Sequence, residues 1–354
     1  MVISSLAVPF VGAPMAGGPS TPELAAAVSE AGGLGFLAGG YLPTPQLARQ
    51  IADVWDTSSR PFGVNLFVPE SANTFTTSYA AGLAPLTGDL RAQAVSRYRE
   101  SLLPEAERLG VELPEAVAGD TDDWDRKLDL VVREKVPVVS FTFGLPGPAV
   151  LVELRRAGIE AVVTVSDVEE AEAAIEAGVD VLVVQGPEAG GHRGTLDPVK
   201  EPSTEDLAEL VAAVREGSTV PIVAAGGIAT RARARQLLDA GATAVQVGTA
   251  LLRTPEAGTS LAYRRALADP SLTRTVVTRA WSGRLARALE TDFVRERDGL
   301  APAAYPEVHH LTSPIRRASA AADDHRCLAL WAGTGWREAG DVPAAVVVGR
   351  IVGD

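Results

Sequence analysis

A regular alternation of short apolar runs and alanine-rich helical segments is the feature that most constrains this chain. Eight β-branched runs lie near residues 10, 35, 65, 140, 163, 183, 223 and 245, and helical patterns separate them. Near-continuous apolar strands between helices are typical of parallel strands that are buried on both faces. The pattern therefore predicts an α/β fold, a (β/α)8 or TIM barrel, which needs about 250 residues. An open doubly wound sheet is the alternative, but it normally carries a phosphate fingerprint after its first strand.

Two segments interrupt the alternation and predict a cap. Residues 70–123 contain polar, alanine-rich and Glu/Arg-rich helical stretches, which we expect Pro85, Pro104 and Pro114 to break. The tail beyond about residue 256 is rich in arginine and alanine and is expected to be mostly helical. We therefore expect residues 1–69 and 124–275 to form the barrel, 70–123 a helical insertion after strand three, and 276–354 a C-terminal helical cap that also closes the barrel.

Charge and cysteine content exclude several classes of protein. A net charge of −13 argues against nucleic acid or an anionic membrane as a partner, since both favour a basic face. The single cysteine, Cys327, cannot form an internal disulfide. No basic segment precedes the first apolar stretch, so we expect no signal peptide and a cytoplasmic protein.

Glycine-rich segments follow the seventh and eighth predicted strands, where a barrel of this kind binds phosphate. Gly226 and Gly227 follow the seventh strand, and residues 246–249 end the eighth. Glycines allow backbone N–H groups to approach a phosphate closely, and a following helix start favours negative charge. The two segments therefore predict a phosphorylated ligand, with a pair of tight turns as the alternative.

The loop after the sixth predicted strand is also rich in glycine, and it places His192 above the barrel mouth. That position favours a catalytic or substrate-binding role over a structural one. The other histidines, His309, His310 and His325, lie in the expected cap. No spacing typical of a three-ligand metal site joins the four histidines, so we expect no metal.

Two amide side chains occur in otherwise apolar strands. Asn65 lies in the third predicted strand, and Gln185 ends the sixth. A buried amide without a partner is costly, so each needs a hydrogen bond. A ligand at the rim and a backbone group are the two alternatives, and the sequence leaves both open.

One apparent motif is rejected. Residues 33–38, Gly-Leu-Gly-Phe-Leu-Ala, match the G-x-G-x-x-A pattern of dinucleotide-binding proteins. The genuine fingerprint follows a strand and opens a helix, whereas this segment follows a helix and enters a strand. Cys327 lies far from any predicted strand end, so we do not expect a cysteine nucleophile either.

Taken in order, seven segments resemble the nitronate monooxygenases, formerly grouped as 2-nitropropane dioxygenases. They are APMAGG (13–18), GVNLFVP (63–69), VVSFTFG (138–144), QGPEAGGHRGT (185–195), AAGGIATRARARQLLDAGA (224–242), QVGTALL (246–252) and TRAWSGR (278–284). The resemblance continues to LWAGTG (330–335) and implies a barrel with a helical cap and FMN as cofactor. It places FMN near Ala13, Pro14, Met15, Asn65, Gln185, Gly190, Gly191, Gly226, Gly227, Gln246, Val247, Gly248 and Thr249.

The same resemblance implies an FMN-dependent oxidoreductase. It would convert alkyl nitronates, or nitroalkanes, with O2 to aldehydes or ketones and nitrite. His192 matches the family's active-site histidine, which would position the substrate and act as general base toward a neutral nitroalkane. A protonated His192 could also attract the anionic nitronate. Because the net charge is −13, a local cation must offset the field, and His192 and Arg193 are the nearest candidates.

Three positions depart from the family pattern. Thr142 stands where many members carry histidine, and members tuned to small charged nitronates carry tyrosine at the position of His309 and lysine at that of Ser313. Losing the lysine removes a cation that could pair with a substrate carboxylate. We therefore expect a preference for a larger or neutral substrate. The residues expected to contact it are His192, Thr142, Tyr305, His309 and Ser313.

Other functions remain as alternatives. An FMN-dependent NAD(P)H reductase of enoyl thioesters or quinones would use the same barrel. A barrel enzyme for a sugar phosphate would explain the glycine-rich segments, but not Asn65, Gln185 and Ala13-Pro14-Met15 together. The expected partners are a small-molecule substrate and O2, without nucleic acid or membrane. The oligomeric state is left open, with a homodimer as one alternative.

Overall fold

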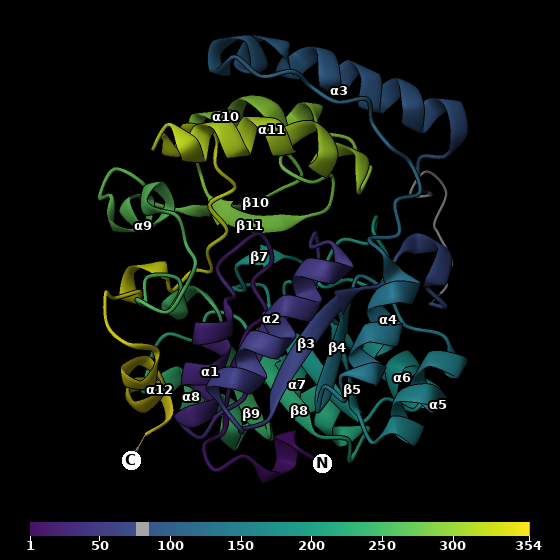
Figure 1. The fold of residues 1–354 in the computed structure, drawn as a ribbon, viewed down its shortest axis with the longest axis vertical. Coiled ribbons are helices and arrows are strands. Elements are labelled where there is room, and N and C mark those ends of the chain that lie inside the picture. The colour runs from purple at the N-terminus through teal and green to yellow at the C-terminus, as the bar shows by residue number, and fades with distance from the viewer. Residues whose placement is uncertain (76–84, 354) are drawn as a thin grey trace.

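Eight parallel strands form the barrel that the alternation of the sequence predicts (Figure 1). They are β1 (Phe10–Gly12), β2 (Gly35–Ala38), β3 (Phe62–Phe67), β4 (Val138–Thr142), β5 (Glu160–Val165), β6 (Val181–Gln185), β8 (Ile222–Ala225) and β9 (Ala244–Val247). The order is β1-β9-β8-β6-β5-β4-β3-β2, and a parallel bridge between Val11 and Leu34 brings the first strand back to the second. The carboxyl ends of all eight strands therefore meet at one rim. The computed structural model describes residues 1–75 and 85–353, so residues 76–84 of the expected insertion and Asp354 lie outside the described part.

Helices surround this barrel. They are α1 (Pro22–Glu30), α2 (Thr44–Thr57), α4 (Trp124–Arg133), α5 (Pro148–Ala157), α6 (Val168–Ala177), α7 (Leu207–Glu216), α8 (Arg231–Asp239) and α12 (Ala344–Val352). Polar side chains cap several of them, as when Thr21 accepts a hydrogen bond from the backbone of Leu24. Gly158 and Gly178 end α5 and α6 in the left-handed conformation that glycine adopts without strain. The last helix, α12, packs against α1 and α8. None of the described helices is both long and apolar enough to cross a bilayer.

Alternate side chains of each strand point into the barrel, which has an apolar floor and a polar top. Val138, Val183 and Val223 belong to the inner apolar cluster, and Ile3 from the N-terminal turn completes it. Inward positions closer to the carboxyl ends are mostly polar, and they include Asn65, Ser140, Thr142, Thr164, Gln185 and Gln246. A second, larger cluster fills the space between the strands and the helices.

Close packing explains the rejected glycine pattern at residues 33–38. A Cβ atom at Gly35 would lie 2.0 Å from the backbone oxygen of Ala25 on α1. The glycine is therefore required for the approach of α1 to β2, and no dinucleotide-binding turn is present there.

The cap lies over one end of the barrel, and both described ends of the chain lie toward the other (Figure 1). It contains α3 (Gly88–Leu109), α9 (Leu261–Ala268), α10 (Asp292–Arg297) and α11 (Glu307–Ala321). It also contains β10 (Thr275–Thr278) and β11 (Ala286–Leu289), and β11 pairs antiparallel with β7 (Gly191–His192).

Two expectations about these segments are wrong. Pro104 does not break the insertion, because it lies inside α3, which is held by burying Val95, Tyr98 and Leu102 against the rest of the cap. The tail is less helical than expected, because β10 and β11 join β7 in a three-stranded sheet. That pairing satisfies the backbone groups and overrides the helical preference of alanine and arginine.

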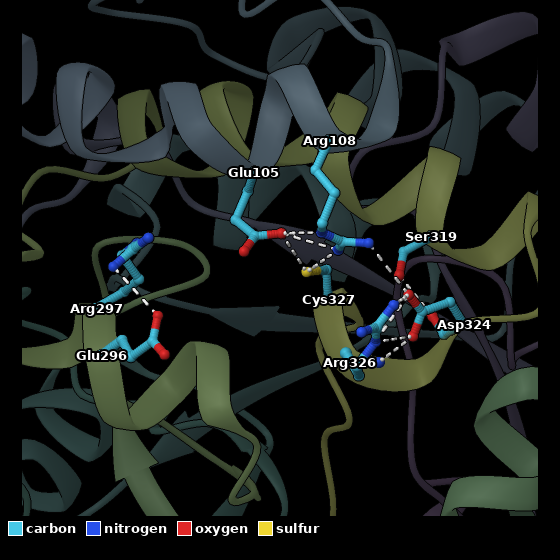
Figure 2. Close-up of polar contacts among 8 residues, drawn as sticks. All are labelled: Glu105, Arg108, Glu296, Arg297, Ser319, Asp324, Arg326 and Cys327. Carbon is cyan, nitrogen blue, oxygen red and sulfur yellow. Dashed lines mark hydrogen bonds and ion pairs between the residues drawn. The ribbon is translucent and has the colours of Figure 1, made fainter.

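Polar contacts around the single cysteine fasten α3 to the C-terminal segment (Figure 2). Arg108 donates to Cys327 Sγ at 3.3 Å, and that thiol lies 3.4 Å from Glu105 Oε2. Arg108 also pairs with Asp324 at 3.5 Å, and Asp324 binds Arg326. Burial raises the pKa of Cys327 to about 12, so the thiol is protonated at neutral pH and donates to Glu105.

Cys327 can report whether α3 is docked, because it belongs to the same buried cluster as Leu102. Leu102→Ala should weaken that packing by about 2–5 kcal/mol and accelerate labelling of the thiol by a cysteine-reactive reagent. Leu103→Ala is the matched control, because Leu103 is the next residue of α3 and 47% exposed. Equal labelling rates in the two variants would contradict this account of how α3 is held.

Candidate active site

A cavity of about 700 Å³ lies at the carboxyl ends of the strands, between the barrel and the cap. This is in the size range of small-molecule sites. Every residue expected to bind the cofactor or the substrate lines it, whereas Arg193, the second candidate for a local cation, does not. On the barrel side these are Ala13, Pro14, Met15, Asn65, Thr142, Gln185, Gly190, Gly191, His192, Gly226, Gly227, Gln246, Val247, Gly248 and Thr249, and on the cap side Tyr305, His309 and Ser313.

The turns after β8 and β9 form a corner rich in backbone donors. Gly226 and Gly227 have φ values of +128° and +64°, which favour glycine. Within the described residues, the N–H groups of Gly226, Gly227, Gly248 and Thr249 donate to no other backbone group. The Thr249 hydroxyl accepts a hydrogen bond from Gly333 N at 3.0 Å, so the tail closes this corner. Such a set of free N–H groups is suited to a phosphate.

Asn65 is held by its amide nitrogen. Its Nδ2 donates to Ser140 Oγ at 2.9 Å, to Ser140 O at 3.2 Å and to Thr142 Oγ1 at 3.0 Å. Its Oδ1 has no donor among the described residues, so this oxygen can accept a hydrogen bond from a ligand. Thr142, which stands where the family pattern has histidine, therefore has a structural role, because its hydroxyl orients the Asn65 amide.

The amide of Gln185 holds the loop that carries His192. Its Nε2 donates to His192 O at 3.0 Å, and its Oε1 accepts from Gly194 N at 2.8 Å. Of the two alternatives left open by the sequence, Gln185 therefore takes the backbone hydrogen bonds. It still lines the cavity.

Aromatic rings surround His192. Its ring centroid lies 5.1 Å from that of Trp331, 5.2 Å from that of Phe143 and 6.4 Å from that of Tyr305. Its Nε2 lies 2.8 Å from Ser282 Oγ, which fixes the ring plane. The imidazole is therefore surrounded by aromatic rings from the cap and the barrel, and the rest of its surface faces the cavity.

This enclosure keeps His192 neutral. Burial, followed by the charges of Arg284 and Arg316, lowers the pKa of His192 to about 3. No carboxylate is among the groups that shift it, so nothing offsets the burial. The expectation that a protonated His192 attracts an anion is not supported by this environment.

Arg193, the other candidate for a cation that would attract an anionic substrate, does not reach the cavity. It is only 2% exposed, and its guanidinium donates to the backbone oxygens of Gly186 and Gln185. It is absent from the cavity lining. Arg193 therefore braces the loop behind His192, and the cation that faces the cavity comes from elsewhere.

Where the barrel meets the cap, the cavity is lined by residues that the sequence did not indicate as functional. The ring of Tyr41 stacks on His309 with centroids 3.7 Å apart and an interplanar angle of 10°. Arg316 donates to His309 Nδ1 at 3.1 Å, and it lines the cavity together with Arg317. Tyr41 has a φ of 66°, which is rare for a bulky residue and cannot be recognised from sequence.

A buried charge lies behind the cavity lining. Arg284 is 3% exposed, and its guanidinium lies 4.2 Å from the ring centroid of Phe143. It donates to Thr195 O at 2.6 Å. Phe143 itself has a φ of 78°, a strained backbone of the kind found at functional sites. Ser282 and Arg284 lie in the segment 278–284, which could have signalled them, although the sequence assigned neither a role.

Arg91 of α3 holds the segment that carries Tyr305 and His309. Its guanidinium binds Glu307 with two hydrogen bonds of 2.7 Å and 2.9 Å, and donates to Tyr305 O at 2.7 Å. It also pairs with Glu70 at 3.3 Å. The insertion is thereby joined to the start of α11, and it positions the cap wall of the cavity.

The comparisons with known proteins match almost the whole length of this chain. The family model described as nitronate monooxygenase matches residues 2–354. A probable nitronate monooxygenase of Staphylococcus aureus is 35% identical over 352 residues, which cover 98% of this chain and 94% of the relative. The structure of a nitroalkane oxidase from Streptomyces ansochromogenes is similar, with a TM-score of 0.89, 44% identity, and coverage of 99% of this chain and 96% of that one. FabK from Thermotoga maritima has a TM-score of 0.73, 25% identity, and coverage of 99% and 93%.

The environment of His192 predicts its titration. The ring nitrogens should stay in the neutral form from pH 5 to pH 9, because the pKa lies at about 3. As the pH falls below roughly 6.5, the unfolded chain binds this proton first, so His192 should lower the free energy of unfolding progressively toward acid. Nitrogen NMR of histidine-labelled protein, assigned with His192→Asn, measures the titration. A midpoint near 6.5 for this ring would contradict the enclosed pocket.

The contacts of Arg91 predict a loss of stability. Arg91→Met should destabilise the protein by about 3–5 kcal/mol, because it leaves the buried carboxylate of Glu307 without a partner. Adding Glu307→Gln should recover part of the loss. Arg97→Met, at an exposed position of the same helix, is the control. Urea unfolding measures all four proteins, and an equal loss in the control would refute a specific role for Arg91.

Proposed function

This chain belongs to the nitronate monooxygenase family, and we propose from that premise that it binds FMN and oxidises alkyl nitronates with O2 to carbonyl compounds and nitrite. It is an oxidoreductase of a flavin-dependent family. The observation that carries the proposal is the convergence of the family's segments on one cavity, with free backbone donors at one corner and His192 in its wall.

The cavity fits FMN at both ends of that cofactor. The four free N–H groups of Gly226, Gly227, Gly248 and Thr249 would bind the phosphate, which needs several donors and tolerates no side chain in their midst. The free Oδ1 of Asn65 would accept a hydrogen bond from the isoalloxazine ring. When bound, FMN supplies electron transfer between the nitronate and O2.

The protein's own contribution is to bind and orient the nitronate in a dry space. Phe143, Trp331 and Tyr305 enclose His192 and exclude water from the reacting carbon. Gln185 holds the loop so that the imidazole keeps its position. Ser282 holds the ring through Nε2, which leaves the other ring nitrogen for a hydrogen bond to substrate.

The neutral state of His192 favours one form of substrate. A general base is most effective when its pKa lies near the working pH, and a value of about 3 makes the imidazole a weak base. We therefore infer that the substrate enters as the preformed nitronate anion. Neutral nitroalkanes, which must first lose a proton from carbon, should react more slowly.

A reductase is the second candidate. The likeness to FabK of Thermotoga maritima extends over 99% of this chain. A reductase on this barrel would take its electrons from NADH or NADPH. The identity of 25% is lower than the 44% to the nitroalkane oxidase, which favours nitronate oxidation.

One set of measurements separates the two functions. The purified protein should show a flavin spectrum, release nitrite from an alkyl nitronate in air without NAD(P)H, and act more slowly on the matching nitroalkane. Anaerobic mixing with the nitronate should bleach the flavin. Rapid bleaching by NADH or NADPH with no response to nitronate would instead establish the reductase, and failure to bind FMN would exclude both.

A further inference from the structure

Two arginines of the cavity lining, Arg316 and Arg317, form no ion pair among the described residues, and Arg316 is the less exposed of the two. Arg316 lies on α11 and lines the cavity, and its guanidinium donates only to the ring and the backbone oxygen of His309, both at 3.1 Å. Its Nε is buried and has no hydrogen-bond partner. Among residues 1–75 and 85–353, no carboxylate forms an ion pair with it. Arg316 is partly buried, and such a charge is stabilised when an anion or further acceptors complete its shell.

The contact with Arg316 also decides which nitrogen of His309 carries a proton. A guanidinium can only donate, so Nδ1 of His309 must accept and its proton must reside on Nε2. Burial, followed by the charge of Arg316, lowers the pKa of His309 well below its usual value, so the ring is neutral. The stacked ring of Tyr41 holds it in place. His309 therefore offers the cavity an N–H donor beside a cation, and neither residue offers an acceptor.

We propose that Arg316 and the Nε2–H group of His309 form an oxyanion subsite in the cap wall, which binds an anionic oxygen group of the substrate. This inference rests on the proposed function, because it assigns a ligand to the same cavity. The oxyanion is either the nitronate group itself or a carboxylate further along the substrate chain. Both present planar pairs of oxygens, which the fork of a guanidinium matches.

The subsite is separate from the corner assigned to the phosphate of FMN. That corner is built from the turns after β8 and β9, whereas His309 and Arg316 belong to α11. The phosphate has its own four backbone donors there. Arg316 is therefore left for the substrate.

The subsite also revises the expectation drawn from Ser313. Loss of a lysine at that position suggested a neutral substrate. Ser313 and Arg316 lie three residues apart on α11, and both line the cavity. The cation is thus retained one turn further along the helix, and selection against charged substrates does not follow.

The test compares Arg316→Met and Arg316→Lys with the unaltered holoenzyme. Arg235→Met is the matched control, because it removes the same charge from an exposed position on α8. Nitrite serves as an inert oxyanion probe, and its dissociation constant is obtained from the rise in melting temperature that it causes. Ethyl nitronate and the nitronate of 3-nitropropanoate are compared as substrates. Arg316→Lys retains the charge, and it is the variant that carries the test if the methionine variant does not fold.

Arg316→Met should weaken nitrite binding or raise the KM of a nitronate by about tenfold to a hundredfold, with partial recovery in Arg316→Lys. Equal losses for the two nitronates would identify the oxyanion as the nitronate group. A loss confined to the carboxylated nitronate would identify a second anionic group.

Unchanged nitrite binding and unchanged KM values in Arg316→Met would overturn the subsite while leaving nitronate oxidation intact. Conversely, nitrite binding that depends on Arg316 in a protein that oxidises no nitronate would retain the subsite and refute the proposed function. An equal effect of Arg235→Met would show that only net charge matters, and it would also overturn the subsite.

Discussion

Closure of the parallel barrel is the constraint on which the rest of the site depends. Because all eight strands run in one direction, their carboxyl ends and the turns that follow them meet at a single rim. Because side chains alternate along each strand, every second residue near that rim points inward. Asn65 on β3, Thr142 on β4 and Gln185 on β6 thereby all line the cavity at this rim, although up to 120 positions of sequence separate them.

The cap covers this rim and forms a cavity, and burial in that cavity changes how charged groups interact. At the surface, a net charge of −13 repels an anion, but salt screens that field over roughly 10 Å. Inside the cavity, burial strengthens nearby charges, and the residues that shift the pKa of His192 are the arginines Arg284 and Arg316. In the proposed site, Arg316 in the cavity lining and Arg284 behind it would attract an anionic substrate, while His192 stays neutral. Fixed arginines suit this arrangement, because guanidinium groups stay protonated even where burial lowers their pKa.

The sequence could predict the parts of the molecule that depend on local pattern and position along the chain. The alternation of strands and helices gives the barrel, and the turns at Gly226 and Gly248 fall where the fold needs them. Contacts across the cap were not predictable. Pro104 inside α3, the pairing of β11 with β7, and the stacking of Tyr41 on His309 each depend on segments that meet only after folding. The neutral state of His192 was missed for the same reason, since it results from burial by Phe143, Trp331 and Tyr305.

His309 and Arg316 of α11 depend on each other for their hydrogen bonds. Arg316 uses one nitrogen to reach both the ring and the backbone oxygen of His309, and its planar fork leaves other donors for a ligand. A lysine ammonium at the same place would lack that fork. A tyrosine at position 309 would offer no ring nitrogen to accept from Arg316, and its hydroxyl would lie further from the backbone. A lysine at 313 would add a like charge one turn away, which is unfavourable on a helix. Histidine at 309, serine at 313 and arginine at 316 are therefore mutually consistent, and in the proposed subsite they would place the cation of the cap wall at position 316.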